Sequence, residues 1–220
     1  MRKVRTAVLG AALMALVAAP SALAVQPATR GFLPPGSGAR GHSIVEIVDA
    51  YNVWAFGTGV GGPILDGRCE QSPIDSKIWF LPVSVGGDAP IVCDVPQGAW
   101  LIETPGGSEC SNLEAEPWYG GDDADLLDCV NETLDYLTYL DITLDGRTQT
   151  FENLAAYIVT GDTVNLPADN LLGSDPGISR FKSYFMVMPP LSRGTHVMRA
   201  YDEFFDGDFV GAVTYTINVH

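Results

Sequence analysis

Three glutamates around one cysteine are the residues of this chain best placed for acid–base chemistry. Glu103, Glu109 and Glu114 flank Cys110. Two carboxylates held about 5 or 9 Å apart in a cleft are what glycoside hydrolysis requires. A disulfide at Cys110 would hold such a loop still, so these glutamates are the candidate catalytic residues of a carboxylate-dependent hydrolase acting on a glycan. Most acidic side chains in a strongly acidic chain are solvated, however, which makes this reading the alternative to a binding role.

Other catalytic motifs find little support in the sequence. It contains neither G-x-S-x-G nor H-E-x-x-H, and its only histidines are His42, His196 and His220. Of these, His196 is expected to be an ordinary strand residue. The glycines at 57, 59 and 62 match the dinucleotide fingerprint as text, but they follow a predicted helix instead of a strand, so they do not predict a phosphate site. The chain is therefore expected to be non-enzymatic.

Two acidic loops are the candidate metal sites. One contains Asp122, Asp123 and Asp125 after two glycines, and the other contains Asp206 and Asp208 around Gly207. Carboxylate oxygens are the ligands that Ca²⁺ prefers, although neither loop fits the EF-hand pattern. Helix N-terminal charge and a hairpin turn explain the same residues without a metal. Calcium is thus a candidate stabilising cofactor.

An aromatic pair in a loop is the candidate ligand contact. Trp118 and Tyr119 lie between Pro117 and Gly120, whereas Trp79 and Trp100 lie inside apolar runs typical of a core. Exposed aromatic side chains anchor many interfaces. The pair predicts a glycan or an extracellular protein as partner.

The cysteines predict two disulfides. The chain has four, Cys69, Cys93, Cys110 and Cys129, with no C-x-x-C that would indicate zinc or thioredoxin-like chemistry. An even count in an exported chain favours disulfides. Three connectivities are possible, and the sequential pairs Cys69–Cys93 and Cys110–Cys129 are favoured because each closes a loop bounded by glycine-rich turns.

The first 24 residues have the three parts of a secretory signal peptide. Arg2, Lys3 and Arg5 precede an apolar run over 6–19, and the run is followed by the small-residue site 22–24. The run is shorter than the roughly 20 residues that a spanning helix needs. Cleavage after Ala24 is expected to release a secreted, extracellular or periplasmic protein with no membrane segment.

Charge excludes several classes of partner. The chain has 12 basic and 27 acidic residues, a net charge of -15. Cleavage would leave 9 basic residues against all 27 acidic ones, and no basic residue lies between Lys77 and Arg147. Nucleic acids and anionic membranes are gripped by clustered Lys and Arg, so neither is expected as a partner. The hydrophobic content of 46% excludes a disordered chain.

Periodicity predicts two helices in a mainly β chain. After a flexible Pro- and Gly-rich leader (25–42), Ser43 and Glu46 form a capping box that opens a helix over 43–56. A second helix is expected over 122–137, with three aspartates in its first turn. Short β-branched or aromatic runs between turn residues predict about nine or ten strands, among them runs over 156–159 and 184–188, with a hairpin turn at Asp145-Gly146.

These elements predict one domain over 43–220. The expected fold is an antiparallel β-sandwich, of the jelly-roll or immunoglobulin-like kind, with two helical insertions and two disulfides.

Several short motifs resemble a family of uncharacterised secreted bacterial proteins. They are Trp79-Phe80-Leu81, Gly86-Gly87, the segment 93–98 (CDVPQG), Glu109-Cys110-Ser111, Asp145-Gly146, Asn153-Leu154, the segment 166–170 (LPADN), the segment 190–196 (PLSRGTH) and Val213-Thr214-Tyr215. The chain departs from the pattern in having fewer tryptophans in its first helix and no arginine just before Cys93. The resemblance implies secretion and a β-rich domain, and it implies no activity.

Taken together, the residues predict an exported acidic binding or surface module that is non-enzymatic, with Ca²⁺ as its candidate stabilising ion. Hydrolysis by the glutamates around Cys110 is the alternative function.

Overall fold

The computed structural model describes residues 31–220 with the exception of 84–89, 135–136 and 208. The signal segment 1–24 therefore lies outside the described residues. The helices are α1 (Ile44–Phe56) and α2 (Asp123–Thr133), and two short 3₁₀ turns are η1 (Leu154–Tyr157) and η2 (Phe205–Gly207). The strands are β1 (Glu70–Gln71), β2 (Ile78–Phe80), β3 (Ile91–Val95), β4 (Trp100–Glu103), β5 (Gly107–Ser111), β6 (Leu137–Leu144), β7 (Arg147–Thr150), β8 (Ile158–Thr160), β9 (Val164–Leu166), β10 (Gly177–Tyr184), β11 (Met186–Met188), β12 (Gly194–Phe204) and β13 (Phe209–Val219).

The strands form three open sheets. The largest has the order β3-β13-β12-β6-β7, the second has the order β1-β2-β4-β11, and the third has the order β5-β10-β8 with β9 paired to β10. All pairings are antiparallel except β2 with β4 and β3 with β13, which are parallel. The expected mainly β sandwich with two helices and two disulfides is confirmed, while these two parallel pairings depart from the purely antiparallel arrangement that was expected.

The core has two principal layers. One cluster fills the space between the five-stranded sheet and the β1-β2-β4-β11 sheet, and it includes Leu101 and Met186 together with Ala200 and Tyr215. The opposite face of β2 and β4 packs on α1, where Phe80 and Ile102 join the apolar side chains of the helix. The order of layers is therefore sheet, sheet and helix.

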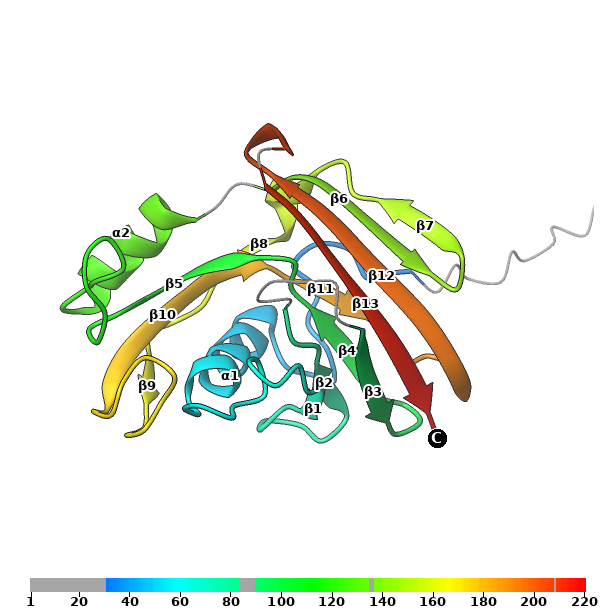
Figure 1. The fold of residues 1–220 in the computed structure, drawn as a ribbon, viewed down its shortest axis with the longest axis horizontal. Coiled ribbons are helices and arrows are strands. Elements are labelled where there is room, and N and C mark those ends of the chain that lie inside the picture. The colour runs from blue at the N-terminus through cyan, green and yellow to red at the C-terminus, as the bar shows by residue number, and fades with distance from the viewer. Residues whose placement is uncertain (1–30, 84–89, 135–136, 208) are drawn as a thin grey trace, which may run out of the picture.

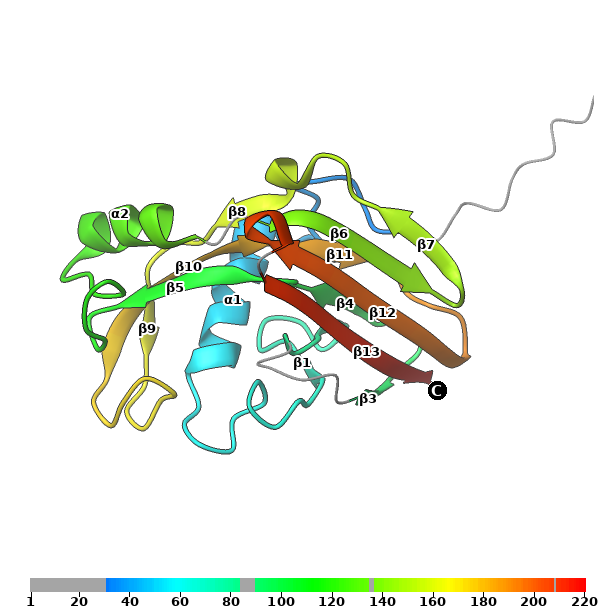
Figure 2. The ribbon, with the colours of Figure 1, turned by 45° about the horizontal axis from the view of Figure 1, so that its top comes forward.

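The two helices lie on opposite sides of β5 and β10 (Figures 1 and 2). Side chains alternate between the faces of a strand. Cys110 accordingly points to α2, where it joins Leu126 and Val130. Its neighbour Glu109 points to the α1 side, where it contacts Ser179 of β10. The short β5–β10 sheet thus has two chemically different faces.

Local capping determines where α1 begins. The hydroxyl of Ser43 accepts a hydrogen bond from the Glu46 amide, and the Glu46 carboxylate accepts one from the Ser43 amide. This is the capping box that the sequence predicts.

Among the described helices, none has the length and apolarity needed to cross a membrane.

The second helix ends earlier than expected. It was predicted over 122–137, but Asp122 is its N-cap and it stops at Thr133. Leu134 is already extended, and Leu137 begins β6, which pairs with β12. Both leucines join the core between the sheets. Burial of the two leucines in this core is more favourable than their continuation of the apolar helix face. The apolar periodicity over 122–137 therefore predicts a helix that is longer than the observed one.

Several strand boundaries also differ from expectation. The predicted run over 184–188 belongs to two strands, because β10 ends at Tyr184 and β11 begins at Met186. In the run over 156–159, residues 156–157 belong to the 3₁₀ turn η1 and residues 158–159 belong to β8. The hairpin turn is confirmed, since Asp145 and Gly146 both have positive φ, at 50° and 77°.

Residues 31–42, expected as part of a flexible leader, contact the domain. The ring of Phe32 packs edge-on against Phe151 with centroids 5.6 Å apart. The amide of Leu33 donates to the carbonyl of Val187 at 2.8 Å, and Ala39 is buried. The described part of the leader is therefore packed on the sandwich.

Both expected disulfides are present. Cys69–Cys93 ties the segment before β1 to β3, and Cys110–Cys129 ties β5 to α2. The second bridge holds the strand that carries Glu109.

We predict that replacing both Cys110 and Cys129 by alanine lowers the free energy of unfolding by about 3 kcal/mol. The bridge closes a loop with a sequence separation of 19 residues, and its loss raises the entropy of the unfolded chain. Urea denaturation measures the change. The matched control is the double replacement at Cys69 and Cys93, with a separation of 24 residues and a comparable expected loss. An unchanged unfolding free energy for the first variant would contradict the prediction.

Candidate functional site

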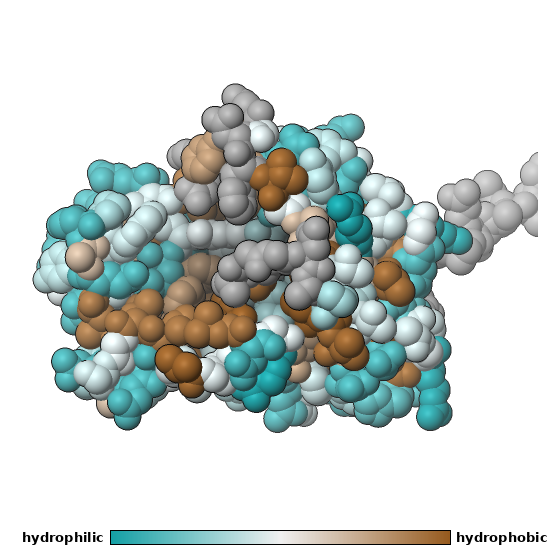
Figure 3. Space-filling view, in the orientation of Figure 1, coloured by the Kyte–Doolittle hydropathy of each residue, from teal (hydrophilic) through white to brown (hydrophobic). Residues whose placement is uncertain are grey.

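A groove between α1 and the third sheet is the most defined site in the described part of the chain. Its volume is about 250 Å³. The face on which it opens is hollowed and carries a band of apolar side chains between β5 and α1 (Figure 3). Aromatic and aliphatic side chains form most of the walls, together with two polar groups and two glycines. The lining residues are Tyr51, Phe56, Ile64, Leu65, Val83, Thr104, Gly106, Gly107, Glu109, Leu171 and Phe181.

Aromatic packing between α1 and β10 builds one wall. The rings of Tyr51 and Phe181 stack with centroids 5.8 Å apart, and Phe56 packs on Phe181 at 5.9 Å. Phe185 and Phe80 contact Tyr51 edge-on from the other side. Such pairs restrict the positions of the rings, so this wall is preformed.

Two glycines keep the floor of the groove free of side chains. A Cβ on Gly107 would lie 2.5 Å from the Cβ of Ser183, and one on Gly106 would lie 2.6 Å from the ring of Phe204. Any larger residue at either position would displace a packed neighbour. Beside them, the hydroxyls of Thr104 and Ser183 are hydrogen-bonded to each other, and Ser183 also donates to the carbonyl of Gly106.

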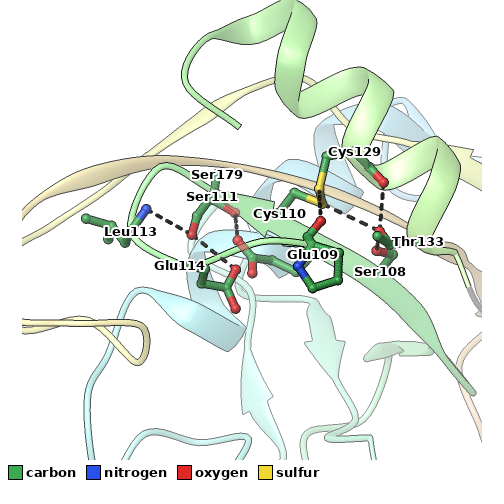
Figure 4. The surroundings of a disulfide bond; sticks show 10 residues. Ser108, Glu109, Cys110, Ser111, Leu113, Glu114, Cys129, Thr133 and Ser179 are labelled. Atoms are coloured by element: carbon green, nitrogen blue, oxygen red, sulfur yellow. Dashed lines mark hydrogen bonds between the residues drawn. A yellow bond between two sulfur atoms is a disulfide. The ribbon is translucent and has the colours of Figure 1, made fainter. Parts of the chain in front are cut away.

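Glu109 is the ionisable group in the groove lining. The hydroxyl of Ser179 donates to Glu109 Oε1 at 2.5 Å, and the amide of Asn52 on α1 donates to the same hydroxyl at 3.2 Å. The carboxyl of Glu114 is hydrogen-bonded to that of Glu109 and accepts a bond from Ser111 Oγ at 3.1 Å. Figure 4 shows both carboxyl groups beneath β5, on the side away from the disulfide.

The surroundings of Glu109 favour its neutral form. Burial and the hydrogen bond with Glu114 together raise the pKa of this carboxyl to about 9, against the opposing effect of the bond from Ser179. No lysine or arginine is among the described lining residues. At neutral pH the groove therefore presents a protonated carboxyl group within mostly apolar walls.

The glutamates are not arranged as in a glycosidase. Those enzymes hold their two carboxyl groups about 5–5.5 Å or 6.5–9.5 Å apart, which leaves room for the sugar or for water. Glu109 and Glu114 are within direct hydrogen-bonding reach of each other, which is closer than either arrangement. Glu103 is not among the groove residues.

Glu103 lies in the core between the five-stranded sheet and the β1-β2-β4-β11 sheet. It is only 1% exposed, and neither carboxylate oxygen has a hydrogen-bond partner in the structure as described. Burial and, second to it, the charge of the nearby Asp202 together raise the pKa of Glu103 to about 8. Burial also raises the pKa of Asp202 to about 6. The hydroxyl of Tyr51 donates to the carbonyl of Leu81, and the hydroxyl of Tyr215 donates to the carbonyl of Pro82.

The aromatic pair predicted as a ligand contact is exposed, as expected for a loop between β5 and α2. Trp118 is 42% exposed and Tyr119 is 45% exposed. Tyr119 borders a shallow hollow of about 320 Å³ that includes Glu116, Asp125 and Glu132. This hollow is separate from the groove.

The predicted calcium ligands have partners within the protein. Asp122 caps α2 through the amides of Ala124 and Asp125, and Asp123 pairs with Arg180 at 2.9 Å. Asp208 and the side chain of Asp206 lie outside the described residues. Within the part of the chain that was searched, no group of three or more His, Cys, Asp or Glu side chains has an arrangement that holds a metal.

His196 lies near a serine and an aspartate, but its hydrogen bonds are not those of a catalytic base. Nδ1 lies 2.6 Å from Asp145 Oδ2, and Nε2 lies 2.9 Å from the carbonyl of Ser192 and 3.4 Å from its hydroxyl. A carbonyl accepts and does not donate, so Nε2 carries a proton and is not available to activate Ser192. The ring connects the β6–β7 turn to the segment before β12.

Sequence reasoning missed the hydrogen-bond partners of Glu109. Asn52 and Ser179 are separated by 127 residues and meet only because α1 packs on β10. Thr104 and Ser183 are likewise distant in sequence. No local pattern marks these residues.

Comparison with known proteins adds no information on function. No family model, curated protein or solved structure matches this chain. The resemblance to uncharacterised secreted proteins stays a prediction, and Gly86-Gly87, one of its motifs, lies outside the described residues. Function is therefore argued from geometry.

We predict that Glu103→Gln flattens the dependence of stability on pH. The folded-state pKa of about 8 exceeds the ordinary value of 4.5, so ionisation costs stability. The cost is absent in acid, grows as pH rises past about 4.5 and is complete above about pH 8. Urea denaturation measures the free energy of unfolding from pH 5 to 8. As the pH rises, this free energy is expected to fall less steeply in the variant than in the wild type, by up to about 1.4 kcal/mol per pH unit.

The matched control for that experiment is Glu152→Gln, because Glu152 is exposed. Its pH dependence is expected to equal that of the wild type. Equal slopes for Glu103→Gln and the wild type would contradict the assignment.

Proposed function

We propose that this chain is an exported binding protein that acts outside the cytoplasm without catalysing a reaction. The signal-like segment 1–24 and the acidic composition support export. The two disulfides are consistent with an oxidising compartment. The mature protein begins at Val25 in this proposal.

The binding site in this proposal is the groove that contains Glu109. One observation carries it: a preformed apolar cavity has a single hydrogen-bonded carboxyl group in its wall. Apolar walls with a few placed polar groups are typical of small-ligand sites. The walls would accept the apolar body of a ligand, and Glu109 with Thr104 would fix its polar end.

Binding is favoured over catalysis by what surrounds the candidate catalytic groups. The Glu109 and Glu114 carboxyls contact each other and leave no space for a substrate between them. The proton on His196 Nε2 is directed to a carbonyl. For these reasons the hydrolase alternative receives less support than a binding role.

Trp118 and Tyr119 retain the second role predicted for them. Their exposure suits contact with a glycan or an extracellular protein partner. Because this loop lies apart from the groove lining, the two sites would be independent.

Export is tested by expressing the full chain with its own N-terminus in a secreting host. We expect mature protein outside the cytoplasm whose first residue is Val25, read by N-terminal sequencing or intact mass. Replacing the small residues at 22 and 24 by aspartate is expected to block cleavage. Accumulation of full-length protein in the cytoplasm would contradict export.

Groove binding is tested with 2-phenylethanol, whose size matches the cavity, by NMR titration of the mature protein. We expect saturable shifts confined to residues of the groove wall. Leu171→Trp is expected to weaken binding about tenfold or more, because the indole fills part of the cavity.

The control is Val92→Trp, which adds the same side chain at a position that is 59% exposed on β3. It is expected to bind like the wild type. Equal binding by the wild type and Leu171→Trp, or no saturable binding at all, would remove the groove from the proposal.

A further inference from the structure

The acidic groups of the groove lack a cationic partner among the described residues. Within the third sheet, the basic side chains Arg180 and Lys182 lie on the other face. Arg180 pairs with Asp123 of α2, and Lys182 donates to Asn131 of α2 at 2.7 Å. Along the chain, no lysine or arginine occurs between Lys77 and Arg147, a stretch that includes all of β5.

We infer that the groove binds a small organic amine with an apolar body, and that its ammonium group pairs with the carboxyl group of Glu109. This inference rests on the proposed function of the groove and names the class of its ligand. An ammonium group has three donors and no acceptor. Glu109 supplies carboxyl oxygens as acceptors, and the rings of Tyr51 and Phe181 contact the apolar body.

Charge complementarity favours an amine over an acid or a neutral molecule. A carboxylate that is removed from water is stabilised by an opposite charge with good hydrogen-bond geometry, and it is costly when unpaired. The chain carries a net charge of -15, so its field attracts cations to the groove and repels anions. A neutral ligand gains the apolar contacts alone.

The size of the groove sets the size of the ligand. A volume of 250 Å³ corresponds to about eight waters at roughly 30 Å³ each, and hence to a ligand of about eight to ten non-hydrogen atoms. The probe 2-phenylethylamine has this size. Its uncharged analogue 2-phenylethanol has the same shape, and it separates the effect of charge from that of apolar contact.

Amine binding should release a proton. Glu109 on β5 faces Ser179 of β10 and Asn52 of α1, which do not titrate, and Glu114 of the following loop. Tyr51 of α1 lines the same groove, and burial raises its pKa, so it stays protonated. Since burial also keeps Glu109 protonated at neutral pH, formation of the ammonium–carboxylate pair expels the Glu109 proton to solvent. No covalent bond forms or breaks.

The test is calorimetric titration of the mature protein with each compound at pH 6, 7 and 8, in two buffers that differ in ionisation enthalpy. We expect the amine to bind about tenfold or more tightly than the alcohol at pH 8. Its affinity should rise about tenfold per pH unit with release of about one proton, whereas the alcohol should show no such dependence.

Two variants locate the effect. Glu109→Gln is expected to remove the preference for the amine and its pH dependence, because an amide does not ionise and carries no charge to pair with an ammonium group. Glu152→Gln, which removes one exposed charge elsewhere, should behave like the wild type.

The outcomes distinguish the inference from the proposed function. If the alcohol binds as tightly as the amine, or if amine binding is independent of pH, the inference is wrong and the groove remains a ligand site. If neither compound binds, both the inference and the proposed function fail.

Discussion

Removal of the Glu109 carboxyl from water is the constraint on which the rest of this site depends. The pairing of β5 with β10 places Glu109 on the α1 side of the sheet, and the packing of α1 brings Asn52 to Ser179 behind it. The bridge between Cys110 and Cys129 fixes the other face of the same strand to α2. A charged carboxylate without a cation is unfavourable there, so the group stays neutral or acquires a partner.

Strand alternation explains how so acidic a protein keeps its few cations away from this groove. On β10, Arg180 and Lys182 face α2, while the alternate residues Ser179 and Phe181 face α1. A shift of register by one residue would exchange these sets and neutralise the groove. The separation of charge across the sheet is thus a consequence of period-two geometry and of the β5–β10 register.

Local signals predicted much of the fold, and long-range packing accounts for what they missed. The capping box at Ser43, the hairpin turn at Asp145 and the disulfide pairs depend on residues near one another, and all are confirmed. The end of α2 was wrong because Leu137 belongs to a sheet that forms with distant strands. The glutamates were singled out for their position beside Cys110, but the seclusion of Glu103 between the sheets and the direct contact between Glu109 and Glu114 needed tertiary packing.

The most direct test of this account is a carboxyl ¹³C NMR titration of Glu109, assigned by its loss in Glu109→Gln. The account predicts that the resonance titrates near pH 9 in the free protein and that its midpoint falls when 2-phenylethylamine is bound. A midpoint near the ordinary value of 4.5 in the free protein would contradict it, because the groove would then carry an ordinary solvated carboxylate.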